Sequence, residues 1–350
     1  MLKRKLCEAV FEWELSCDGP LLIADGRYQA PKNDKNGNNN TNQEKGIYPD
    51  KLFISRAPTV PQLTPQNYKN PAAFNLPYYI PGTSLRGPFR AQAERIIRTL
   101  ATADTTPPAT ACNPFDMNDD NPQSCSKRLD KTKAEVPYSA VCPACKLFGC
   151  TATASRIEFA DAEIIDKDDP NRPVRSVYRD MIGIDRFTGG VYSGANMRFH
   201  ALENTRFSST ITVTNFELWQ LGLLAYVLRD FEEGLVPIGF GKTKGFGQVK
   251  GTIKSIELRY PKTASLDQTL AHLGSLASSE EQKRYQLHNA PDCIFSDLIP
   301  STAPLLSIYS GYQVTPDKYN TFWEGTADAF NHFMHWIETP EAQAKPEATT

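Results

Sequence analysis

The sequence predicts an α+β fold with an inserted segment and a partly helical C-terminal extension. Segments that alternate apolar and polar residues, as half-buried strands do, recur along the chain. Two segments with apolar residues at helical spacing separate them. In order, the first 260 residues give strand, helix, insertion, two strands, helix and strand, which is the ferredoxin-like, RNA-recognition-type order. Hydrophobic residues make up 40% of the chain, enough for a packed core.

Residues 1–100 are predicted to hold the first strand and the first helix. The segment LCEAVFEWELSCDGPLLIA favours a strand, a Gly-Pro break and a second short strand. Residues 25–46 are rich in Asn and Lys and have little to bury, which predicts a long mobile loop. KLFIS predicts a short strand. In YYIPGTSLRGPFRAQAERIIRTL, Thr83 or Ser84 can cap a helix whose apolar stripe is Leu85, Phe89, Ile96, Ile97 and Leu100.

Residues 101–150 are predicted to form an irregular insertion, and they hold five of the eight cysteines. Such clustering in a chain with few cysteines favours a metal over disulfides. Four thiolates can close a structural zinc site and stabilise a segment that has little core of its own. Cys150 is expected to pack in the core, although it could replace one of the two upstream ligands. The predicted ligands are Cys112, Cys125, Cys142 and Cys145.

Residues 151–260 are predicted to complete the core. ASRIEFADAEII and RFSSTITVT predict strands, and RDMIGIDRFTGGVYSGANMRFHALE predicts one or two hairpins because of its Gly-Gly and Ser-Gly turns. NFELWQLGLLAYVLRDFEEG predicts a helix that is capped by Thr214 or Asn215 and ends at Gly234. A strand, a glycine-rich loop and a last strand follow. Residues 261–336 are predicted to be mostly helical or irregular, and residues 337–350 to be disordered.

The glycine-rich loop GFGKTKGFGQVKG, residues 239–251, does not fit the familiar nucleotide-binding motifs. The first glycine of a Walker A loop would fall on Val236. The third glycine of a kinase loop would fall on Lys244 or Lys250. Exposed backbone N–H groups, lysines and aromatic rings suit a polyanion such as an RNA backbone. A tight turn with solvated lysines is an equally good interpretation of this loop alone.

The charge distribution permits a nucleic-acid partner despite a net charge of −2. From residue 261 onward there are 5 basic and 11 acidic residues, so the first 260 residues carry 33 basic against 29 acidic. A local footprint for phosphates can therefore exist. No run of eighteen apolar residues and no signal peptide are evident, so we expect a cytoplasmic protein without a membrane span. The basic clusters are Arg86–Arg98, Arg172–Arg186 and Lys242–Lys250.

Four segments in order resemble the RAMP (repeat-associated mysterious protein) superfamily. YYIPGTSLRGPFR resembles its IPGSSLKG-x-x-R helix start, and CPACKLFGCTATASRIEFADAE its LFG…SRLxFxDA segment. GIDRFTGGVYSGA is similar to its IDRxTG segment, and GFGKTKGFGQVKG to its terminal glycine-rich loop. The resemblance spans about residues 1–258.

The resemblance implies a backbone subunit of a prokaryotic type III CRISPR effector complex with a modified RNA-recognition fold. Its partners would be a guide RNA, a complementary target RNA, other RAMP subunits and the large subunit of the complex. A β-hairpin thumb would kink the guide–target duplex. The zinc-binding insertion is similar to a feature of type III-D and III-E members. Many type III members cleave target RNA at a loop aspartate with Mg²⁺ or another divalent ion.

The resemblance also implies roles for individual residues. YPDKLFISR is similar to the family's D-x-x-V-x-R pattern and makes Asp50 the predicted catalytic residue, with Asp34 as a second candidate. A subunit without chemistry and a guide-processing endonuclease remain as alternatives, although the core offers the latter only His200. The predicted RNA contacts are Ser84, Arg86, Arg90, Arg186, Thr188, Lys242, Lys244 and Phe246.

Overall fold

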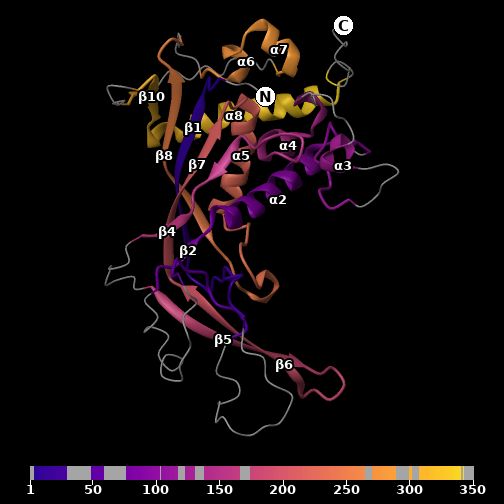
Figure 1. Ribbon diagram of the computed structural model, residues 1–350, viewed down its shortest axis with the longest axis vertical. Helices are drawn as coiled ribbons and strands as arrows, with labels where there is room; N and C mark the ends of the chain where they lie inside the picture. The colour runs from indigo at the N-terminus through magenta and orange to yellow at the C-terminus, as the bar shows by residue number, and fades with distance from the viewer. Residues whose placement is uncertain are drawn as a thin grey trace.

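The computed structural model describes most of the chain in an α+β architecture (Figure 1). Asp34, most of the predicted loop 25–46 and most of the predicted disordered tail 337–350 lie outside the described residues. The described residues are 4–29, 49–58, 76–102, 104–116, 123–130, 138–165, 174–264, 270–288, 299–301, 307–339 and 342.

The central sheet has the ferredoxin-like order that the sequence predicts. Strand β1 (Glu8–Cys17) lies between β7 (Thr205–Thr214) and β8 (Lys250–Pro261), antiparallel to both. Strands β3 (Ile157–Phe159) and β4 (Ala162–Ile164) pair with β7 on the other side. The core order is therefore β8-β1-β7-β4, corresponding to fourth, first, third and second.

Further strands extend both edges of this sheet. Strand β2 (Tyr79–Ile80) pairs with β4. On the opposite edge, β10 (Tyr309–Val314) pairs with β8, and β9 (Ile299–Pro300) pairs with β10. The C-terminal extension thus contributes strands to the sheet itself.

Alternation along the strands decides which face of the sheet is covered. On β1 the odd-numbered side chains from Ala9 to Cys17 are buried, and every second residue of β7 is buried as well. Helices α2 (Gly82–Leu100) and α5 (Leu218–Glu232) cover this apolar face (Figure 1). The Trp13 ring meets Phe89 of α2 and Phe231 of α5 edge-on, with centroids 5.3 and 5.4 Å apart.

Helix α8 (Tyr319–Ile337) makes the C-terminal extension part of the same core. Its Phe333 stacks on Trp219 of α5 with ring centroids 4.0 Å apart, and its Trp323 stacks on Phe11 of β1. The helices approach so closely at Gly222 that a Cβ there would lie 2.0 Å from the Thr326 carbonyl oxygen. The crossing therefore requires a glycine.

Smaller helices complete the insertion, the extension and two connections. Helices α3 (Cys125–Asp130), η2 (Tyr138–Ala140) and α4 (Pro143–Phe148) lie in the insertion. Helices α6 (Leu273–Leu276) and α7 (Ser279–Tyr285) follow β8. The 3₁₀ turns η3 (Lys242–Lys244) and η4 (Pro316–Lys318) lie in the glycine-rich loop and before α8.

A buried polar network joins the insertion, the core and the extension at Glu217. Its carboxylate accepts hydrogen bonds from Tyr138 Oη at 2.6 Å and from the His288 backbone N–H at 3.1 Å, and it pairs with Arg156 at 3.4 Å. Burial opposes the charge on Glu217, but the positive charges of Arg156 and Lys146 lower its pKa. An unpaired buried charge would be costly, so the carboxylate keeps these partners. The contacts therefore hold the insertion, the core and the C-terminal extension together.

Strands β5 (Arg175–Ile184) and β6 (Val191–Glu203) form the predicted hairpin as a separate two-stranded sheet that projects from the core (Figure 1). Strand β6 continues directly into β7, since only Asn204 separates them.

Several local predictions were wrong. Leu100 of the predicted apolar stripe is 49% exposed, and KLFIS forms only isolated bridges. Helix α2 begins at Gly82 and takes no cap from Thr83 or Ser84, because Asp161 Oδ1 accepts the Gly82 N–H at 2.9 Å. Glu217 caps α5, whereas the Asn215 side chain accepts the Leu6 backbone N–H. The residues before the glycine-rich loop form no strand.

In the described part of the chain, no helix is both long and apolar enough to span a membrane.

Candidate functional site

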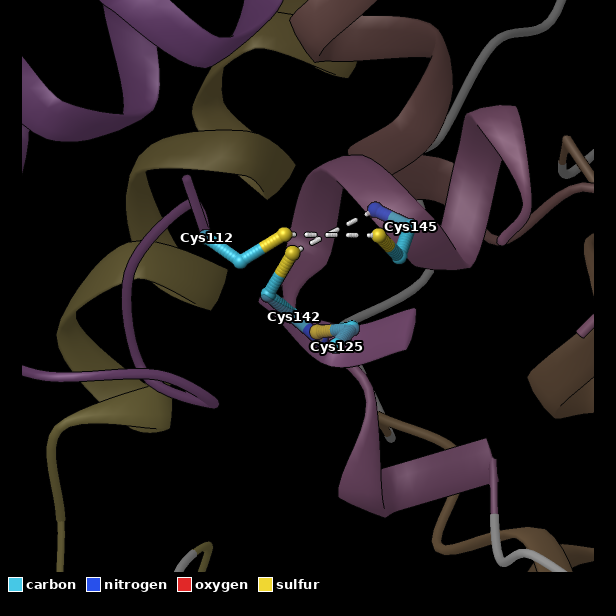
Figure 2. A group of neighbouring side chains, drawn as sticks. All are labelled: Cys112, Cys125, Cys142 and Cys145. Carbon is cyan, nitrogen blue, oxygen red and sulfur yellow. Dashed lines mark hydrogen bonds between the residues drawn. The ribbon is translucent and has the colours of Figure 1, made fainter. Parts of the chain in front are cut away.

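The four predicted metal ligands meet in one buried cluster (Figure 2). The sulfur atoms of Cys112, Cys125, Cys142 and Cys145 all lie within 4.8 Å of one another. The sulfurs of Cys112 and Cys145 are 3.7 Å apart. Cys150 is half-buried and lies outside this set. The insertion therefore brings together residues that are up to 33 positions apart in sequence.

The cluster fits a tetrahedral metal ion. A Zn–S distance of about 2.3 Å gives a tetrahedron with edges of about 3.8 Å, close to the observed Cys112–Cys145 separation. The backbone N–H of Cys142 donates to Cys125 Sγ at 3.3 Å, and that of Cys145 donates to Cys142 Sγ at 3.5 Å. Hydrogen bonds from the thiols of Cys112 and Cys142 lower the pKa of Cys125. The donor set is thus the one that binds a thiophilic ion such as zinc.

Arg86 and Arg90, two of the predicted RNA contacts on α2, face the insertion. Arg86 donates to the Phe148 carbonyl, and Arg90 donates to the Gly149 carbonyl at 3.0 Å and to Cys145 Sγ at 3.4 Å. The N-terminus of α2 is likewise engaged within the chain. Asp161 accepts the Gly82 N–H, and the Ser84 N–H donates to the Pro81 carbonyl.

The glycine-rich loop is held against the start of the chain and the base of the hairpin. Phe240 N–H donates to the Leu22 carbonyl and Gly247 N–H to the Pro20 carbonyl, both at 2.8 Å. Gly239 has a φ of +76°, and a Cβ there would lie 2.4 Å from the Leu22 carbonyl oxygen. Gly247, at +77°, would clash with the Ile238 carbonyl in the same way. The glycines therefore shape the loop.

The loop exposes its lysines and buries its second phenylalanine. Lys242 and Lys244 are exposed on η3. Phe246 is only 2% exposed and packs in the core against Phe199 of β6, so it offers no free ring face for a base. Phe240 is 38% exposed and also touches Phe199, at 5.2 Å between centroids. The accessible ring of this loop is thus Phe240.

The hairpin presents the other predicted contacts at its tip. Asp185 organises the turn, since its carboxylate accepts the Phe187 N–H at 2.9 Å and the Thr188 hydroxyl at 3.0 Å. Those donors lower the pKa of Asp185. Arg186 and Thr188 are exposed, and the Phe187 side chain is fully exposed. The other exposed apolar residues of the hairpin are Ile182, Ile184, Val191, Tyr192 and Met197.

Asp50 lies at the base of the hairpin. Its N–H donates to the Arg198 carbonyl, and its Oδ2 accepts the Arg198 N–H, both at 2.7 Å. The Arg198 guanidinium pairs with Asp180 of β5. The Asp50 side chain is exposed, and the next residue, Lys51, pairs with Phe199, the residue that contacts the glycine-rich loop. Lys244 Nζ lies 5.9 Å from the centroid of the same Phe199 ring, so this edge of β6 has Asp50 and Lys244 at neighbouring residues.

Two other ionisable side chains, Asp25 and His200, are engaged in contacts within the protein. Asp25 is buried and paired with Arg27 at 2.7 Å, which lowers the pKa of its carboxyl. His200 is 2% exposed, its Nδ1 accepts the Phe53 N–H, and its Nε2 lies 2.5 Å from Ser176 Oγ. Burial lowers the pKa of His200 to about 4. A neutral, enclosed imidazole is not placed for catalysis on a bound substrate.

The comparison with protein families shows which family the chain belongs to. The RAMP superfamily model matches residues 14–250, which include the end of β1, the insertion, the hairpin and the glycine-rich loop up to Lys250. The chain belongs to the RAMP superfamily. As a RAMP protein it is a CRISPR-associated RNA-binding subunit, and its general partners are RNA and other subunits of that system. No curated protein matches the chain.

Some residues of this RAMP site carry no recognisable sequence signal. Arg198 and Phe199 connect Asp50 to the loop, yet they lie in a segment where only turn residues stand out. Hairpin pairing would have placed Arg198 opposite Asp180, since the two are register partners. Nothing in the sequence indicates that the segment around Asp50 returns to this edge.

Proposed function

We propose that this RAMP protein is a backbone subunit of a type III CRISPR effector complex that binds guide RNA and cleaves target RNA. The observation that carries the proposal is the convergence at the hairpin base. An exposed aspartate, a cationic glycine loop and a projecting hairpin share one edge of β6. Lysines and arginines can bind phosphates, and such contacts position the RNA. Base pairing between guide and target then supplies the sequence specificity.

The hairpin and the loop supply complementary contacts. The tip carries a fully exposed phenylalanine beside Arg186, and further apolar side chains follow along both strands. Apolar side chains inserted between base steps unstack them and kink a duplex. Lys244 lies over the Phe199 ring of β6, and Lys242 is exposed on the same 3₁₀ turn. The proposed path of the RNA therefore runs from the glycine-rich loop along the hairpin toward its tip.

Asp50 is the proposed catalytic residue. Only Oδ2 of its carboxylate is bound to the Arg198 N–H in the described contacts, which leaves Oδ1 for substrate. The Asp50 carboxylate would help to remove the proton of a ribose 2′-OH, whose oxygen attacks the adjacent phosphorus. The P–O5′ bond breaks, and the departing oxygen takes a proton. The products are a 2′,3′-cyclic phosphate and a 5′-OH.

A divalent ion fits this site as a cofactor. Mg²⁺ is commonly held by one or two carboxylates, phosphate oxygens of the substrate and water, so Asp50 together with RNA suffices. When bound, the ion stabilises negative charge on the phosphate. The buried and neutral state of His200 weighs against a guide-processing endonuclease that uses histidine for acid–base work, because His200 is the one histidine of the first 260 residues.

We also propose that the buried cysteine cluster binds zinc in a structural role. Four thiolates without an open position form a closed site. The site lies within the insertion and stabilises it, separate from Asp50.

Co-purification with nucleic acid tests the proposed function most directly. The protein expressed with its neighbouring subunits should carry a small RNA of defined length, and the complex should cut complementary RNA at regular spacing. A complex that assembles without RNA would refute the proposal. A complex that holds guide RNA without cutting would leave the backbone role and remove the catalytic one.

A further inference from the structure

The polar face of α2 beside the cysteine insertion carries Arg90, Glu94 and Arg98 at four-residue steps. Glu94 is 7% exposed and lies between Arg90 and Arg98. It accepts a hydrogen bond from Arg90 Nε at 2.8 Å and from Arg98 Nη2 at 3.3 Å. One buried carboxylate therefore orients both guanidinium groups.

Each of these arginines contacts a segment that bears a metal ligand. Arg90 donates to Cys145 Sγ at 3.4 Å and to the Gly149 carbonyl at 3.0 Å. Arg98 donates to the Cys112 carbonyl at 2.5 Å. A third arginine, Arg128 of α3, donates to Cys125 Sγ at 3.8 Å and to the Ala140 carbonyl at 2.5 Å. Three of the four ligands thus have an arginine partner.

The charges of this arrangement oppose those of a loaded centre. A divalent ion with four thiolates carries a net charge of −2. The three arginines and Glu94 together carry +2, and the buried Lys146 of α4 interacts with Cys142 and Cys125 as a further cation. A buried net charge of −2 is costly unless it is paired and hydrogen-bonded, and contacts of this kind outside the ligands tune the affinity for the metal.

We propose that the Arg90–Glu94–Arg98 triad of α2, with Arg128, is the charge-compensating outer contact layer of the metal centre. Arg90 and Arg98 are positioning residues that hold the Cys145 and Cys112 segments on α2, and the ligand they serve is a divalent thiophilic ion. Arg90 is thereby assigned to the metal centre and not to guide RNA. The assignment stands whether or not the protein cleaves RNA.

The test compares Arg90→Met and Arg98→Met with Arg95→Met in the full chain. Arg95 lies on the same helix, is exposed and contacts Gln92, so its loss controls for a missing surface charge. Zinc affinity is measured by competition with a chromophoric chelator, and Co²⁺ replaces Zn²⁺ to report thiolate ligation by absorption. RNA affinity is measured on the same samples at several salt concentrations.

We expect Arg90→Met and Arg98→Met to lower metal affinity about 10- to 100-fold each, the range typical of lost contacts to metal ligands. Arg95→Met should leave it unchanged, and RNA affinity should stay within about twofold for Arg90→Met. Arg90→Lys, which keeps the charge and loses the forked geometry, should fall between wild type and Arg90→Met. Unchanged metal affinity in Arg90→Met, or a loss of RNA affinity with a shallower salt dependence, would overturn the proposal.

Discussion

Asp50 and Arg198 hold each other by a reciprocal pair of hydrogen bonds. The Asp50 N–H donates to the Arg198 carbonyl, and the Arg198 N–H donates to the Asp50 carboxylate, at 2.7 Å in both directions. The backbone half of this pair does not depend on the Asp50 side chain. The carboxylate can therefore be removed while the segment stays attached to the hairpin.

Asp50→Ala should abolish one cut per subunit in the target RNA while assembly and guide binding persist. Loss of a positioned proton acceptor typically costs about 10²- to 10⁴-fold in rate. Single-turnover cleavage, resolved on a sequencing gel, measures the effect. Asp34→Ala serves as the matched variant. If it removes the cut and Asp50→Ala does not, the assignment of Asp50 is wrong.

Replacing Lys242 and Lys244 by Ala should weaken RNA binding most at low salt. Each lost phosphate contact on a single strand should reduce the slope of log affinity against log salt by about 0.7, so about 1.4 for both. Lys262→Ala with Lys283→Ala gives a control of equal charge on the C-terminal extension. Equal slopes in wild type and the loop variant would mean that the loop lysines are merely solvated.

The purified protein should contain about one zinc ion per chain. Removing it should loosen the insertion, because the four cysteines come from three separate segments that the metal would join, at Cys112, at Cys125 and at Cys142–Cys145. Elemental analysis measures the content, and protease sensitivity between residues 101 and 150 measures the loosening. Cys150→Ser should retain the metal, whereas Cys142→Ser should lose it. A metal-free protein with an intact insertion would contradict this.

Acid should destabilise the fold partly through His200. Its pKa is lowered to about 4 in the folded state, so between about pH 6.5 and 4 the unfolded chain binds more protons. Stability is therefore lost as pH falls through this window, by up to about 3 kcal/mol from this group. Urea unfolding at pH 7 and pH 5 should show a smaller decline for His200→Gln than for wild type. Parallel declines in both proteins would show that His200 does not contribute.

Gly222→Ala should destabilise the protein by about 1–3 kcal/mol, because the new Cβ would meet the Thr326 carbonyl at 2.0 Å and force α5 from α8. Gly87→Ala is the matched control. Gly87 also lies within a helix, but nothing lies within 4 Å of its added Cβ, so it should gain about 0.5–1 kcal/mol. Thermal unfolding distinguishes the two, and equal shifts would contradict the close crossing.

The core order and the cysteine ligands were predictable because their signals are local. Alternation sets the strands, and the Cys142–Cys145 spacing marks a metal site wherever the other two thiols lie. The capping of Gly82 and the burial of Phe246 were not predictable in this way. Asp161 caps a helix that begins 79 residues earlier, and the Phe246 ring turns inward to Phe199 across 47 positions. The contacts of Arg90 with Cys145 and Gly149 were not predictable either, because the sequence pattern does not reveal that the insertion folds back on α2.

The family match ends at residue 250, but the packing does not. Trp219 of α5 is covered by Phe333, and Phe11 of β1 by Trp323, both from a helix beyond the matched region. The region that the family model covers is thus smaller than the packed core. A chain truncated after β8 would keep every recognisable motif and still expose two aromatic surfaces to water. The end of the family match and the end of the packed core therefore fall at different residues of this domain.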